Sequence, residues 1–202
     1  MIIMMNRSSA GKVILVVALA TVWALLLLSG CGLQTDEANK ALEKANKRQE
    51  QAEAILARLR GFPAEWEANF SQLTPQQFIA AQQLVKAREQ DVEALQAALN
   101  EWEAEMSYIN TLNVDEKIKE YVRLKTNSIK CWESYTEHFL LPIVKGYEGL
   151  LQTVSLGRPE QEQTKAAMEI SALVRESTVK LEECRDSEKQ AEKYFTENRL
   201  GE

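Results

Sequence analysis

Apolar residues recur every three or four positions between residues 78 and 109, for more than four heptads. This spacing places one apolar stripe along one face of an α-helix, and it is typical of a coiled-coil or helical-bundle seam. A threonine and a proline suited to a helix start precede it, so we predict a helix over 75–112, about 57 Å long. Arg88 alone breaks the stripe, whose members are Phe78, Ala81, Val85, Val92, Leu95, Leu99, Trp102, Met106 and Ile109.

Three further segments carry helical stripes: 36–60, the stretch from Glu116 to a turn at Gly157, and 159–197. The 202 residues include only 8 glycines and 4 prolines, and no stretch alternates long enough to predict a strand. Short turns between the last three helices make them antiparallel neighbours. We therefore expect an all-α fold. It is an elongated antiparallel helical bundle of three to four long helices with coiled-coil-like seams, forming a single domain over 36–202.

An uncharged apolar run precedes the predicted bundle. It covers the 16 residues 13–28, with Arg7 and Lys12 before it and no acidic residue in the leader. A basic start, an apolar centre and small residues at the end describe a secretory signal. The run is also shorter than the roughly 20 residues that a membrane-spanning helix needs. We therefore interpret 1–30 as a signal peptide, with a permanent spanning anchor as the alternative.

The run ends in Leu28-Ser29-Gly30-Cys31, which resembles the lipobox of bacterial lipoprotein precursors at every position. The resemblance implies cleavage between Gly30 and Cys31 and fatty acyl chains such as palmitate on Cys31. Residues 31–35 then form a lipidated tether, and two or more acyl chains hold a protein stably on a bilayer. The implied location is extracytoplasmic. It is the outer face of the cell membrane, or the outer membrane in a Gram-negative host.

Small residues dominate the inner stripe of the first predicted helix at its end near the membrane, which predicts thin packing or mobility there. Gly61 and Pro63 are expected to end it. It either joins the bundle as a fourth member or stands as a stalk, whose exposed heptad face would drive self-association. The connector that follows carries Trp66 and Phe70. We expect these aromatic rings to plug one end of the bundle, the alternative being a binding loop.

Once lipid occupies Cys31, the remaining cysteines are Cys131 and Cys184. If Gly157 is the turn of a helical hairpin, Cys131 lies 26 residues before it and Cys184 lies 27 residues after it. The two cysteines then lie at the same height along the axis of the hairpin, to within about 1.5 Å. An exported compartment permits disulfides, and this bridge would contribute about 4 kcal/mol in the chain-entropy model. We expect the disulfide, with two free buried cysteines as the alternative.

Signals for chemistry are weak. The net charge of −6 becomes −8 once a leader with two basic residues is removed, which argues against nucleic acid as a partner. His138 is the one histidine, and its neighbour Glu137 points about 100° away around a helix. One histidine and two distant cysteines lack metal-ligand spacing. We therefore predict no enzyme, no catalytic residue, no cofactor and no metal site.

Two functions remain open. The first is a lipid-anchored structural or interaction module in the bacterial cell envelope, with an envelope protein or the cell wall as partner. The second is a small-ligand or sensor module, with a pocket where Pro142 interrupts its helix near Gly146 and Tyr147. A lipobox followed by a charged helical body is also similar to the helical cell-wall-binding lipoproteins of Gram-positive bacteria, which implies a cell-wall partner.

Overall fold

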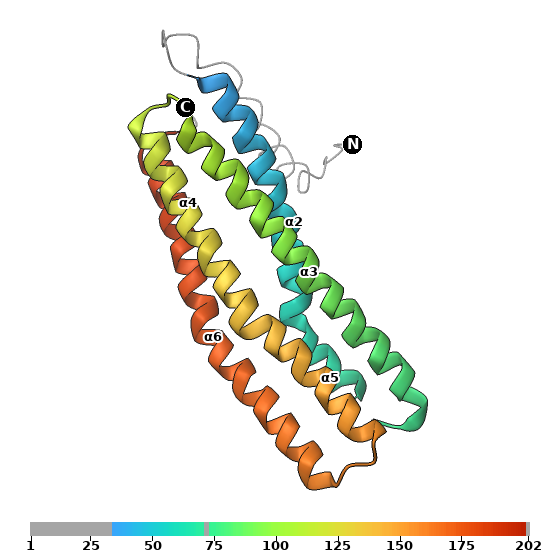
Figure 1. Ribbon diagram of the computed structural model, residues 1–202. Coiled ribbons are helices and arrows are strands. Elements are labelled where there is room, and N and C mark those ends of the chain that lie inside the picture. The colour runs from blue at the N-terminus through green and yellow to red at the C-terminus, as the bar shows by residue number, and fades with distance from the viewer. Residues whose placement is uncertain (1–33, 71–72, 201–202) are drawn as a thin grey trace, which may run out of the picture.

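The described chain, residues 34–70 and 73–200 of a computed structural model, forms four antiparallel rods in an elongated up-and-down array (Figure 1). Three rods are single α-helices: α2 (Thr35–Phe70), α3 (Pro75–Thr111) and α6 (Glu160–Glu197). The remaining rod joins α4 (Glu116–Tyr135), the π-helical segment η1 (Thr136–Leu140) and α5 (Leu141–Ser155). Every element in this part of the chain is helical, so the predicted all-α fold is confirmed.

The helices are arranged in the order in which they follow one another along the chain. α3 packs between α2 and the α4–η1–α5 rod, and α6 packs against that rod. α2 and α6 make almost no close backbone approach. The bundle therefore has three tight seams, and the boundary between α2 and α6 is the loose one.

The first predicted helix joins the bundle as a fourth member. Its apolar side chains, among them Ala38, Leu42 and Leu59, are buried against the other helices. The stalk alternative is wrong for this structure, because the stripe that a stalk would expose is covered within the chain. Self-association through this helix stays a prediction.

The expected end of this helix at Gly61 and Pro63 is also wrong, since α2 continues to Phe70. A proline inside a helix costs about 3 kcal/mol, while full burial of a large apolar side chain contributes about 1.5–3 kcal/mol. Phe62 and Trp66 are 0% and 6% exposed, and they keep this position only if the helix continues. Burial of the two rings therefore offsets the cost of the proline.

Ion pairs line the two seams of α3, and in most of them α3 carries the acidic residue and its neighbour the basic one. Glutamates and an aspartate of α3 mostly face lysines and arginines of its neighbours. On the α2 side the pairs are Lys44–Glu105, Arg48–Glu101 and Arg58–Asp91, and on the other side they are Lys130–Glu103 and Lys145–Glu89. Each exposed pair contributes little alone, but the pattern of charges selects which helices are neighbours.

Pro142 does not end its helix, because a π-helical turn precedes it. The Leu141 N–H donates to the Thr136 carbonyl, five residues back, and the Thr136 hydroxyl donates to the Trp132 carbonyl at 2.7 Å. Such a turn inserts one extra residue into the helix and changes the local pattern of carbonyl acceptors. The interruption predicted at Pro142 is therefore a local bulge in a continuous rod.

Two glycines of the α5–α6 hairpin occupy positions that disfavour a residue with a side chain. Gly157 adopts a left-handed backbone with φ of 62°, and the hydrogen bonds Gly157 N–H to Val154 O and Arg158 N–H to Thr153 O close the end of α5. Gly146 lies where α5 approaches α6, and a Cβ built there would lie 2.7 Å from Ile170 Cγ1. A side chain at Gly146 would therefore force these helices apart.

We expect Gly146→Ala to lower the free energy of unfolding by about 1–3 kcal/mol, because the added methyl group overpacks the contact with Ile170. Gly149→Ala is the matched control: a Cβ there meets no atom within 4 Å, and alanine favours a helix interior over glycine by up to about 1 kcal/mol. Urea denaturation of both variants checks this. Equal effects of the two substitutions would contradict the close approach at Gly146.

Candidate functional site

The predicted lipidation and cleavage residues, Gly30 and Cys31, lie outside the described residues, as do the rest of the predicted leader and residues 201–202. The described chain starts at Gln34, directly before α2. In residues 34–70 and 73–200, no helix combines the length and apolar character needed to cross a membrane. Three candidate sites lie within the described bundle: the cysteine pair, the polar side chains at seam positions and the surroundings of Pro142.

Cys131 and Cys184 meet as the hairpin geometry predicted. Their sulfur atoms are 2.11 Å apart and their Cα atoms 5.3 Å apart, which is disulfide geometry. Cys184 is fully buried, and Cys131 packs at the edge of the core. The bridge joins Cys131, in the last turns of α4, to Cys184 of α6, so these two helices form a stapled pair.

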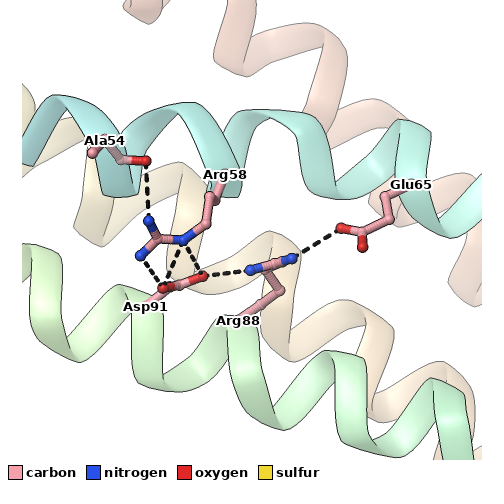
Figure 2. Close-up of polar contacts among 5 residues, drawn as sticks. All are labelled: Ala54, Arg58, Glu65, Arg88 and Asp91. Carbon is pink, nitrogen blue, oxygen red and sulfur yellow. Dashed lines mark hydrogen bonds and ion pairs between the residues drawn. The ribbon is translucent and has the colours of Figure 1, made fainter.

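Arg88, the break in the apolar stripe of α3, belongs to a network of charged side chains between α2 and α3 (Figure 2). Its guanidinium bonds Asp91 at 2.5 Å and Glu65 at 3.0 Å. Arg58 of α2 reaches the same Asp91 carboxylate at 2.6 Å and also donates to the Ala54 carbonyl. Arg88 and Asp91 side chains are each 13% exposed, so this network takes the place of an apolar contact in the seam.

The carboxylate of Asp91 is held in its charged form. Burial acts to raise its pKa, but hydrogen bonds from Arg58 and Arg88 outweigh burial, so the pKa lies below its ordinary value of 3.8. At neutral pH, Asp91 therefore accepts hydrogen bonds from Arg58 of α2 and from Arg88 of α3. It fixes the axial position of α2 relative to α3.

A second polar group lies deeper, where all four rods meet. Lys125 of α4 is 3% exposed. Its ammonium lies 3.3 Å from Gln49 Oε1 of α2, 3.9 Å from Glu188 Oε1 of α6 and 5.8 Å from the ring centroid of Trp102 of α3. Gln49 in turn donates to Glu188 Oε1 at 2.9 Å. We call Gln49, Trp102, Lys125 and Glu188 the polar layer.

The environment of Glu188 disfavours its charge. Burial raises the pKa of this carboxyl, Lys125 acts in the opposite direction, and the nearby carboxylates Glu53 and Glu192 raise it further. The polar layer therefore holds a Lys125–Glu188 ion pair in which burial and neighbouring carboxylates oppose the charge of Glu188. Sequence reasoning missed this layer, although Gln49, Lys125 and Glu188 each occupy a position where a helical stripe skips one apolar residue.

The surroundings of Pro142 are packed with apolar and aromatic side chains. Ile143, Val144 and Tyr147 are buried. The Tyr147 ring lies 4.7 Å from the Phe62 ring and 4.6 Å from the Trp66 ring, measured between centroids. Burial, with a contribution from Glu67, raises the pKa of Tyr147 to about 12. The expected aromatic plug is therefore present, and Tyr147 is part of it.

The remaining candidate groups lie on η1. His138 and Glu137 are both exposed on η1. In the described ranges, no group of three or more histidine, cysteine, aspartate or glutamate side chains is placed to hold a metal ion. The polar layer and the Arg58–Asp91–Arg88 network carry hydrogen bonds and charges between helices, which is the chemistry of helix pairing.

The disulfide predicts that neither Cys131 nor Cys184 reacts with iodoacetamide when the protein is unfolded without reductant. Peptide mass spectrometry measures this at each cysteine separately, so the state of Cys31 does not interfere. Reduction should lower the free energy of unfolding by about 4 kcal/mol, because the released loop regains conformational entropy in the unfolded chain. Alkylation of both residues before reduction would contradict the bridge.

We expect Asp91→Asn to lower the free energy of unfolding at pH 7 by about 1.5–3 kcal/mol, because two arginines lose a charged acceptor. Glu93→Gln is the control, since Glu93 lies on the exposed face of the same helix. Because the Asp91 pKa is lowered, its contribution is present above pH 3.8 and is lost as the pH falls through the folded-state pKa. In strongly acidic buffer, the difference in free energy of unfolding between the wild-type protein and Asp91→Asn should therefore be smaller. A difference as large as that at pH 7 would exclude an ionic role for Asp91.

The sequence matches no protein-family model, and it shows no significant similarity to a curated protein or to a solved structure.

Proposed function

We propose that this protein is a lipid-anchored interaction module of the bacterial cell envelope, attached to the membrane through Cys31. The observation that carries the proposal is the sequence Leu28-Ser29-Gly30-Cys31, placed directly before a helical bundle. Two residues separate Cys31 from Gln34, the first described residue. A lipid on Cys31 would therefore keep one end of the bundle close to the bilayer surface.

The connectivity supports a defined orientation of such a module. The start of α2 lies beside the turn between α3 and α4, since Gln34 N–H donates to the Asn113 carbonyl at 2.9 Å. The end of α6 lies at the same end of the bundle (Figure 1). The turns between α2 and α3 and between α5 and α6 lie at the other end. A 38-residue helix such as α6 spans about 57 Å, so these turns would face away from the membrane.

The physical character of the bundle supports a binding or structural role. Cross-helix ion pairs line both seams of α3, and a cysteine pair joins α4 to α6. Such a body presents fixed helix faces to a partner at low cost in conformational entropy. The alternative of a ligand pocket at Pro142 has less support, because apolar side chains fill the interior beside the π-helical turn.

The proposal is tested by growing cells with an alkyne-bearing palmitate analogue and measuring its incorporation into the protein. We expect the wild-type protein to carry the label and to sediment with membranes. Cys31→Ser should abolish the label, because the thiol that accepts lipid is lost. The double variant Cys131→Ser/Cys184→Ser is the control and should keep the label.

Label that persists in Cys31→Ser, or a mature N-terminus other than Cys31, would overturn the lipid anchor. For the interaction role, a photo-crosslinking residue at Leu156, which is 68% exposed in the turn after α5, should give one discrete adduct in cells. That adduct should require Cys31, because the anchor brings the module to its partner. Adducts spread over bulk membrane proteins would count against a dedicated partner.

A further inference from the structure

The two halves of α2 are held in the bundle by different forces. The half from Ile55 onward buries large side chains: Ile55, Leu56, Leu59, Phe62 and Trp66. The half before it buries one leucine and four alanines: Ala38, Ala41, Leu42, Ala45 and Ala52. Stabilisation by burial scales with the apolar area removed from water. The N-terminal half is therefore held much less by apolar contact than the C-terminal half.

Polar contacts fasten this N-terminal half at its start. Gln34 and Asn113 bond reciprocally: Gln34 N–H donates to the Asn113 carbonyl at 2.9 Å, and Asn113 N–H donates to Gln34 Oε1 at 3.0 Å. We call this pair the clasp. Both residues are exposed, so water competes for the same donors and acceptors, and the clasp opens at low cost.

Polar contacts also fasten the middle of this half. Gln49 occupies the core position between Ala45 and Ala52, and its amide joins Lys125 and Glu188 in the polar layer. Further along the surface, Lys44–Glu105 and Arg48–Glu101 are exposed ion pairs, which contribute little to stability. Release of Gln49 would let water reach a lysine and a glutamate whose burial is costly.

The later half of α2 and the α4–α6 pair are fastened more firmly. The cysteine pair joins α4 to α6. Arg58 of α2 bonds Asp91 of α3 just beyond the midpoint of α2, and the aromatic plug holds α2 to α5 through Phe62 and Tyr147. α6 makes almost no close backbone approach to α2. Within α2, local opening is therefore cheapest in the first half.

We propose that residues 35–52 form a releasable arm between the membrane anchor and the helical body. The arm opens by breaking the clasp and withdrawing Gln49 from the polar layer, while the rest of the bundle stays folded. Eighteen residues that remain helical extend the reach of the body by about 27 Å. This consequence for reach rests on the proposed lipid anchor, whereas the opening itself does not.

Hydrogen–deuterium exchange with mass spectrometry on the full protein, isolated in detergent, tests the arm. Amides of residues 40–52 should exchange at least about tenfold faster than those of 55–70, because they open without global unfolding. Gln34→Ala should increase exchange in 40–52 a further severalfold and leave 55–70 unchanged. Gln96→Ala, on the exposed face of α3, is the matched control and should change neither segment.

Equal exchange rates in the two halves of α2 would overturn the arm, as would a Gln34→Ala effect spread over all of α2. Neither outcome depends on lipid at Cys31. Absence of the palmitate label from the wild-type protein would instead overturn the anchor and leave the exchange result standing. The two proposals therefore fail independently.

Discussion

The alignment of the four rods depends on the burial of Lys125. A buried ammonium group is strongly unfavourable unless it is paired and hydrogen-bonded. Its partners come from three other helices: Gln49 of α2, Trp102 of α3 and Glu188 of α6. Sliding α6 by a turn would remove the compensating carboxylate, and sliding α2 or α3 would remove a hydrogen-bond acceptor or an aromatic face. The polar layer therefore sets a common level along the bundle, to which the apolar contacts above and below are fitted.

Different interactions stabilise different helix pairs within that arrangement. α3 is fastened to both neighbours by cross-helix ion pairs, and α6 is fastened to α4 by the cysteine pair. α2 is fastened firmly only from Ile55 onward, through large side chains and the Arg58–Asp91 contact. Within α2, stability is consequently lowest in the segment that would lie next to a lipid on Cys31. The proposed releasable arm would therefore lie between that lipid and the helical body.

Much of the fold could be read from the spacing of apolar residues. The stripe of α3 and the positions of Cys131 and Cys184 around Gly157 predicted a helix and a pairing that the structure contains. The prediction failed at Gly61 and Pro63, where local propensity favoured an end and the burial of Phe62 and Trp66 favoured continuation. It was also incomplete for the polar layer: skipped positions in three separate stripes were visible, but nothing local showed that Gln49, Lys125 and Glu188 would meet.

The sequence by itself determined the helical periodicity, the lipobox-like segment and the level of the cysteines, because each depends on residues close in the chain or on one simple hairpin. Only the tertiary structure decided that α2 joins the bundle, that Arg88 bonds both Asp91 and Glu65, and that Lys125 finds its partners. These are contacts between residues up to 139 positions apart. Their energies depend on burial and on the simultaneous presence of every partner. Neither can be predicted from the spacing of apolar residues along one helix.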